Sequence, residues 1–174
     1  NNVVAGQDQL TVLNQGTANG QISVVGSAVS YGGVSIGTIS GGTLGTPLTV
    51  SLNGNATPTA VDALIQRVAY GNSSQLPDTT PRSITITVKD GDGTANGGTD
   101  SVSSTMTVNV ISVNDAPTFS NLSGTRAFTE GGNAVVLDNN ASLADRELAI
   151  NNNYGGATLT LSRAGGANGD DNFR

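Results

Sequence analysis

The segment S-I-T-I-T-V at residues 83–88 alternates polar and apolar residues, which places its three aliphatic side chains on one face of a β-strand. Residues 101–111, S-V-S-S-T-M-T-V-N-V-I, continue this alternation and predict that Met106 points inward. The segment between them, D-G-D-G-T-A-N-G-G-T-D at residues 90–100, consists mostly of residues that favour turns. Together the three segments predict a long β-hairpin.

Shorter segments with the same alternation occur along the whole chain, separated by Gly, Asn and Ser. The expected strands are residues 9–13, 21–25, 34–39, 48–52, 67–70, 126–129, 134–137 and 157–161, with a polar loop at residues 145–147. One segment has a different pattern. Thr57 is a typical helix N-cap, Pro58 suits the first helical position, and apolar residues follow at helical spacing, which predicts a short helix near residues 58–66. The chain is therefore expected to be all-β with one short helix.

The composition excludes several classes of protein. The chain has 174 residues, 13 acidic and 7 basic side chains, a net charge of −6, and neither His nor Cys. Zinc fingers, thiol nucleophiles, Ser-His-Asp triads and disulfide scaffolds all need one of those two residue types. The acidic balance argues against nucleic acid as a partner, and no apolar run is long enough to span a bilayer. We therefore expect no enzymatic activity, no nucleic-acid binding and no membrane insertion.

The segment S-V-N-D-A-P at residues 112–117 separates two parts of the sequence. Pro117 fixes its own backbone and favours an extended conformation at Ala116. A stiff segment with an acidic residue, placed after a strand, is typical of an interdomain linker. We predict a linker at residues 113–117 between a first domain, residues 1–112, and a second, residues 118–174.

Three segments carry a resemblance to a known family. They read T-P-T-A-V-D-A-L-I-Q-R-V-A-Y-G-N-S-S (57–74), R-S-I-T-I-T-V-K-D-G-D-G (82–93) and V-N-V-I-S-V-N-D-A-P-T (108–118). They resemble the cadherin-like repeats of large bacterial surface adhesins. That resemblance implies Ig-like Greek-key β-sandwiches in tandem, usually stiffened by calcium, in a secreted, extracellular or cell-surface protein. The later T-E-G-G-N-A-V-V-L-D (129–138) with A-D-R-E (144–147) resembles the opening half of the next repeat.

The chain is also expected to be out of phase with these repeats. The segment A-G-G-A-N-G-D-D-N-F-R (164–174) aligns with N-N-V-V-A-G-Q-D-Q-L-T (1–11) at an offset of 163 positions. The matched pairs are Gly6 with Gly169, Asp8 with Asp171, and Leu10 with Phe173. Residues 1–112 would then be the later strands of one sandwich and residues 118–174 the first strands of another. Each half would be completed by a neighbour, either in a longer protein or in a second chain.

The resemblance implies a calcium site, and seven residues are its expected ligands. Asn114 and Asp115 match the N-D-x-P linker motif, Glu130 resembles the glutamate of the first strand, and Asp145 with Glu147 matches the D-R-E motif. Glu130, Asp145 and Glu147 follow the linker in the sequence. In an alternative arrangement they would therefore serve the junction with the following domain. Asn114 and Asp115 would then pair with Asp90 or Asp92. Oxygen ligands of these types suit calcium, and ordinary solvated loops are the competing interpretation.

Two further groups of carboxylates are candidate sites. Asp90 and Asp92, with Asn96 and Asp100 in the same glycine-rich loop, could hold calcium or could simply form turns. Asp170 and Asp171 are adjacent, so on a strand they would point to opposite faces. They could not readily act as acid and base on one bond, which argues against glycosidase chemistry.

Three functions remain as hypotheses. The first is a structural or adhesive segment of an extracellular fibrous protein, stiffened by calcium between tandem domains, with any glycan or protein ligand bound elsewhere in the molecule. The second is a filament subunit whose identical chains exchange β-strands head to tail. The third is a carbohydrate-binding module. It has weak support because sugar platforms need exposed aromatic rings, and the chain has no Trp. Its aromatic residues are Tyr31, Tyr70, Phe119, Phe128, Tyr154 and Phe173.

Overall fold

The computed structural model describes residues 3–166 and 168–172. The chain forms two compact units, Asn1–Ser112 and Val113–Arg174, each with its own set of internal contacts. The similarity between the two end segments of the chain falls partly on residues 1–2, 167 and 173–174. Its pairing of Leu10 with Phe173 therefore lies outside the described residues.

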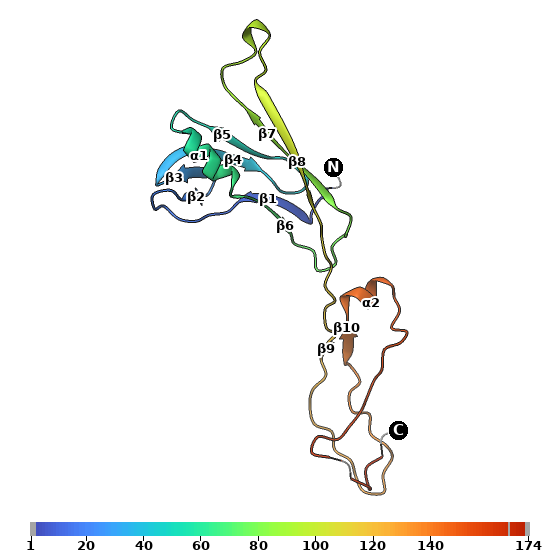
Figure 1. Cartoon of the computed structure of the whole chain (residues 1–174). Helices are drawn as coiled ribbons and strands as arrows, with labels where there is room; N and C mark the ends of the chain where they lie inside the picture. Colours follow the sequence, from blue (N-terminus) through green and yellow to red (C-terminus); the bar gives the residue numbers. More distant parts are fainter. Residues whose placement is uncertain (1–2, 167, 173–174) are drawn as a thin grey trace. The chain divides into compact units, whose positions relative to one another are not determined.

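Unit 1 is built from antiparallel strands and one short α-helix (Figure 1). Its elements are β1 (Asp8–Val12), β2 (Ile22–Val25), β3 (Ala28–Tyr31), β4 (Val34–Gly41), β5 (Leu48–Leu52), α1 (Pro58–Ile65), β6 (Val68–Asn72), β7 (Arg82–Lys89), a 3-10 turn (Ala95–Gly97) and β8 (Ser101–Val108). Strands β2 to β5 pair in sequence order, β1 pairs with β6, and β7 pairs with β8. The prediction of an all-β, sandwich-like fold with a short helix is confirmed.

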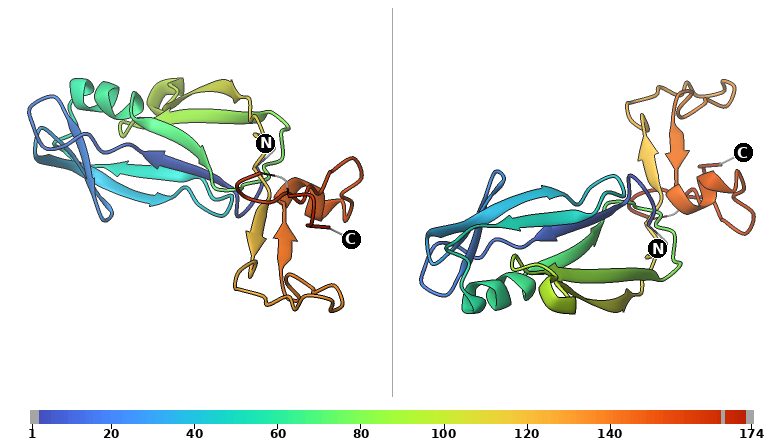
Figure 2. Two further views of the ribbon diagram at one scale, coloured as in Figure 1. Left: turned by 90° about the horizontal axis from the view of Figure 1, so that it is seen from below. Right: turned by 90° about the horizontal axis from the view of Figure 1, so that it is seen from above.

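The hydrophobic core of unit 1 lies between α1 and the strands beside it (Figure 2). It contains Val12, Ile22, Val29, Ile36, Ala60 and Leu64, all buried. The helix begins as the sequence predicts: the Thr57 hydroxyl accepts a hydrogen bond from the Ala60 N–H at 3.3 Å, and Pro58 occupies the first turn. Ala60 and Leu64 are four residues apart, so they share the helix face that packs on the sheet. Through Val12 this core holds β1, and with it the paired strand β6, in position for the polar cluster described below.

The β7–β8 hairpin has one apolar face and one polar face. Ile84 lies opposite Met106 and Val88 opposite Val102, while hydroxyl groups pair across the other face. The sequence predicts that Met106 points inward. Met106 does share the face of buried Ile84, but its exposed fraction is 54%, so the expected burial is wrong. Val102 is 69% exposed. Alternation assigns a side chain to a face, but whether that face is buried depends on what packs over it.

Unit 2 contains less regular structure than the sequence suggests. Strands β9 (Thr118–Ser120) and β10 (Ser142–Ala144) pair antiparallel, and a helix, α2 (Arg146–Ile150), follows at once. Residues 126–129, 134–137 and 157–161, expected as strands, have no assigned strand structure. Among the described residues of unit 2, the buried residue is Asp145, and its aliphatic side chains are exposed or half-buried. A two-stranded hairpin is marginally stable alone, so alternation without a partner strand is not enough.

The D-R-E segment, expected to be a polar loop, is instead the start of a helix. Asp145 is the N-cap residue of α2, and its Oδ1 accepts a hydrogen bond from the Leu148 N–H at 2.8 Å. An aspartate in this position satisfies one of the free N–H groups of the first turn. Asp145, expected as a calcium ligand in a loop, is therefore placed by its capping of a helix.

Candidate functional site

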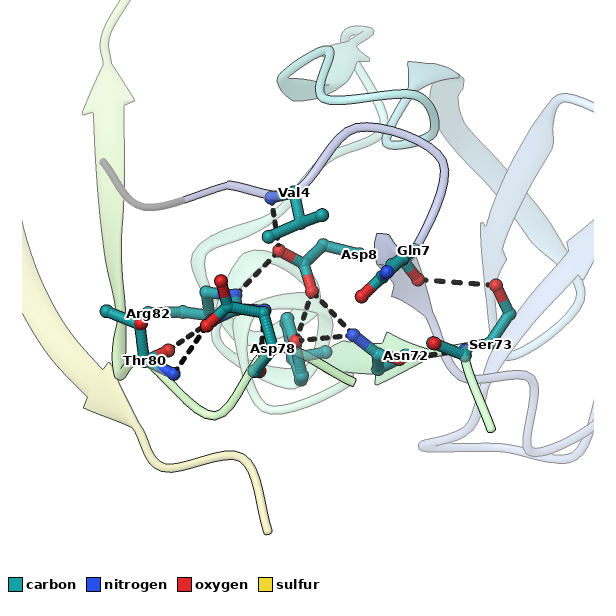
Figure 3. Close-up of polar contacts among 10 residues, drawn as sticks. Val4, Gln7, Asp8, Asn72, Ser73, Asp78, Thr80 and Arg82 are labelled. Carbon is teal, nitrogen blue, oxygen red and sulfur yellow. Dashed lines mark hydrogen bonds and ion pairs between the residues drawn. The ribbon is translucent and has the colours of Figure 1, made fainter. Parts of the chain in front are cut away.

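The most extensive polar cluster of unit 1 is centred on the buried carboxylate of Asp8 in β1 (Figure 3). Its Oδ2 accepts hydrogen bonds from Arg82 Nε at 2.7 Å and from the Val4 N–H at 2.7 Å. Its Oδ1 accepts hydrogen bonds from the Tyr70 hydroxyl and from Asn72 Nδ2, the latter at 2.9 Å. Tyr70 and Asn72 belong to β6 and Arg82 begins β7, so one side chain connects three strands.

The same contacts determine the charge state of Asp8. Burial by itself would raise the pKa of this carboxyl group. The hydrogen bonds from Arg82, Tyr70, Val4 and Asn72 oppose burial and lower the pKa of Asp8 to about 2. Burial and the Asp8 carboxylate together raise the pKa of Tyr70. The aspartate is therefore charged and the tyrosine neutral across the physiological range.

Arg82 is buried and fully engaged at the base of β7. Beyond Asp8, its guanidinium donates hydrogen bonds to the Thr80 carbonyl and, at 3.1 Å, to the Asp78 carbonyl. A cavity of about 180 Å³ borders the cluster and is also lined by Leu10, Pro47 and Ile84. It is smaller than the pockets of about 300–1,000 Å³ that hold small molecules. The polar groups of the Asp8 cluster already pair with one another, so we assign the cluster a structural role.

The hairpin tip brings together three aspartates of unit 1. The Asp90 N–H donates to the Asp100 carbonyl at 2.9 Å, and the Asp92 N–H donates to Asp90 Oδ1 at 3.4 Å. The side-chain hydrogen bond between Asp90 and Asp92 raises the pKa of Asp90, and the nearby charges of Asp92 and Asp100 add to this effect. Lys89 Nζ lies 2.8 Å from Asp100 Oδ2. Asp90 and Asp92 are exposed, and the geometry is that of a turn stabilised by side-chain and backbone hydrogen bonds.

In unit 2 the linker motif and the D-R-E motif meet. The pairing of β9 with β10 sets Thr118 opposite Ala144, which brings Asp115 toward the start of α2. The Asp115 N–H donates to Glu147 Oε1 at 3.4 Å. The other oxygen, Glu147 Oε2, is buried and has no hydrogen-bond partner among the described residues. A buried carboxylate oxygen without a donor is costly, so this position is suited to a bound cation.

The remaining predicted ligands do not gather at this position. Asn114 is next to the group, and its Nδ2 donates to the Asp115 carbonyl at 3.0 Å, which leaves its side-chain oxygen available. Glu130 lies in an exposed turn, and Asp90 and Asp92 belong to unit 1. Within residues 3–166 and 168–172, no three acidic side chains converge closely enough to form a metal-binding group. Of the seven predicted ligands, the structure brings together the Asn114–Asp115 segment and Glu147, with Asp145 at the N-cap of the same helix.

The Asp8 cluster is not predicted by the sequence. Asp8 stands out there only as the counterpart of Asp171 in the end-to-end alignment. Its partners follow it by 62, 64 and 74 positions, a spacing that matches no local motif. A carboxylate on one strand and an arginine on another can be recognised as a buried pair only when the arrangement of the strands is known.

Comparison with known proteins identifies no relative: no protein-family model, no curated protein and no solved structure matches the chain. Among the described residues, no helix is long and apolar enough to cross a bilayer. Among the aromatic residues considered for sugar stacking, Tyr70 donates its hydroxyl to Asp8, and Phe119 and Phe128 are exposed in unit 2.

Proposed function

We propose that this chain is a structural segment of a secreted or cell-surface fibrous protein, built from tandem β-domains and stiffened by calcium. The observation that carries the proposal is the buried, unpartnered Oε2 of Glu147 next to Asp115 and Asp145. The segment would extend and rigidify the protein, while any glycan or protein ligand is bound elsewhere. The absence of His and Cys and the resemblance to cadherin-like repeats support a non-enzymatic role.

The residues that would hold calcium come from two segments that are separate in sequence. Asn114 and Asp115 lie in the segment that leads into β9, and Asp145 and Glu147 lie at the start of α2. Calcium would supply the positive charge that these oxygens otherwise lack. Without it, the buried Oε2 of Glu147 keeps no partner, and this cost favours opening of the Asp115–Glu147 hydrogen bond. Closing that contact fixes the conformation of residues 114–117 within unit 2, and a fixed segment transmits force better than a flexible one.

Calcium binding by the full chain tests this proposal. We expect isothermal titration calorimetry to detect calcium binding, and Glu147→Gln to weaken it about tenfold or more, because the substitution removes one carboxylate charge from the donor set. The matched control is Glu130→Gln, which removes the same charge from an exposed turn. We expect this control to bind calcium like the unchanged chain. Equal affinities for the two variants, or no binding by the unchanged chain, would contradict the proposal.

A further inference from the structure

The chain exposes far more surface than a compact protein of its mass. Its solvent-accessible surface is 12448 Å². A single compact domain of this mass would expose about 7,800 Å², and two separate compact domains of the lengths of the two units about 9,400 Å². A stable protein–protein interface buries about 1,200–2,000 Å² in total. The chain exposes about 3,000 Å² more than two separate compact domains would. This excess is enough for at least one stable interface.

In unit 1 the uncovered surface includes the outer edge of β8. This strand pairs with β7 on one side, and no other strand of the described residues pairs with it. Val102 and Met106 are exposed on the face that also carries Ser104, and every residue of the strand except Val108 is exposed. The strand contains no charged residue and no proline, the features that usually protect an edge strand from pairing with another chain.

The mainly apolar face of the hairpin continues from buried to exposed residues and includes Ser104 between Met106 and Val102. Ile84 is buried, its cross-strand neighbour Met106 is half exposed, and Val102 farther along is largely exposed. On the opposite face, Thr85 pairs with Thr105 at 3.0 Å and Thr87 with Ser103 at 2.7 Å. A strand added at this edge would need apolar residues on one face and small hydroxyl residues on the other, because side chains alternate between the faces of a sheet.

Unit 2 contains a segment with this composition. Residues 157–161 read A-T-L-T-L, so Leu159 and Leu161 share one face and Thr158 and Thr160 the other. Leu159 is 78% exposed, and none of these residues belongs to a strand among the described elements. The segment carries no charge, so its approach to uncharged β8 meets no local repulsion even though the chain as a whole is acidic.

We propose that residues 157–161 of one copy of this chain add as a strand to the outer edge of β8 in a second copy. Leu159 and Leu161 then extend the apolar face of Val102 and Met106. The two threonines extend the hydroxyl face. Main-chain hydrogen bonds supply the pairing and the alternating side chains supply its specificity. The edge and the added strand belong to different segments of each chain, so the contact is heterologous and leads to head-to-tail assembly.

Sedimentation velocity on the full chain, in excess chelator, tests this proposal without involving calcium. We expect the unchanged chain to assemble as its concentration rises. The edge variant Val102→Asp and the strand variant Leu159→Asp should each remain monomeric when alone, because each buries an unpaired charge in the contact. An equimolar mixture of the two should form a heterodimer and grow no further, since one intact edge and one intact strand remain. Both replaced side chains are exposed within their own unit, so folding should be preserved, as circular dichroism can verify.

Matched controls use equally exposed residues outside the contact. Val25 is 74% exposed on β2, an edge strand of the four-stranded sheet, and Leu44 is exposed in the turn between β4 and β5. Val25→Asp and Leu44→Asp should assemble like the unchanged chain. The proposal is overturned if the unchanged chain is monomeric at every concentration, including the case in which the strand pairs within its own chain. It is also overturned if Leu159→Asp or Val102→Asp assembles as the unchanged chain does.

Discussion

Replacing Asp8 by alanine is expected to destabilise unit 1 by about 3–5 kcal/mol, which is typical when one partner of a buried ion pair is removed. Arg82 is almost completely buried, and its Nε would lose the carboxylate that lies 2.7 Å away. The Tyr70 hydroxyl and Asn72 Nδ2 would lose their shared acceptor at the same time. Urea unfolding of the full chain, followed by circular dichroism, measures this change.

Asp78→Ala is the matched control for Asp8→Ala. Asp78 also faces Arg82, but at 3.7 Å and with an exposed side chain, and its backbone carbonyl, which Arg82 also contacts, is unchanged by the substitution. Asp78 Oδ1 also accepts a hydrogen bond from the Thr80 N–H at 2.7 Å, and an exposed ion pair and an exposed hydrogen bond each contribute little to stability. We therefore expect a small effect at most. Similar unfolding midpoints for Asp8→Ala and the unchanged chain would refute the structural role of the cluster.

The pKa of Asp8 adds a dependence on pH to this result. Because the pKa in the folded chain is about 2, below the ordinary value of 3.8, the unfolded chain takes up a proton first as the pH falls. The stabilisation by Asp8 is complete above about pH 4 and is lost as the pH falls toward 2. The unchanged chain should lose stability through this window, and Asp8→Ala should lose less of it.

The second large effect is expected in the hydrophobic core. Ile36 on β4 is 1% exposed and packs with Ile22 and Leu64. Ile36→Ala should lower the free energy of unfolding of unit 1 by about 2–5 kcal/mol, because it removes buried methyl and methylene groups and leaves a cavity. Urea unfolding measures the change, and the denaturant dependence should stay the same if the unit remains compact.

The same substitution at an exposed isoleucine is the control. Ile150 ends α2 and is largely exposed. Ile150→Ala should change stability by less than about 0.5 kcal/mol. A comparable loss at both positions would show that burial within unit 1 does not account for its stability.

The elements predicted correctly are those whose signals are local. Thr57 and Pro58 mark the start of α1, and the alternation at residues 83–88 marks β7, because capping and strand periodicity act within a few residues. Residues 157–161 have an equally clear alternation but no strand structure, because a strand also needs a neighbour. Met106 is exposed for a related reason: alternation places it on one face of the hairpin, but its burial depends on what packs over that face.

The sites depend on contacts between distant parts of the sequence, and this limits their prediction. The motifs around Asp115 and Glu147 are recognisable in the sequence, and the structure brings these two residues together. Glu130 belongs to the same predicted set, but the turn that carries it leads elsewhere. Asp8 and Arg82 cannot be paired from the sequence, because the pairing of β1 with β6 and the position of β7 determine their contact.

Hydrogen exchange of the backbone amides in unit 2, measured with calcium and then with excess chelator, tests the calcium proposal most directly. The Asp115 and Leu148 amides donate to Glu147 and Asp145, so a bound cation that orders these carboxylates should slow their exchange. We expect slower exchange in residues 113–120 and 142–150 with calcium, no change around the unit 1 core, and loss of the effect in Glu147→Gln. Identical exchange in calcium and in chelator at these amides would contradict the account.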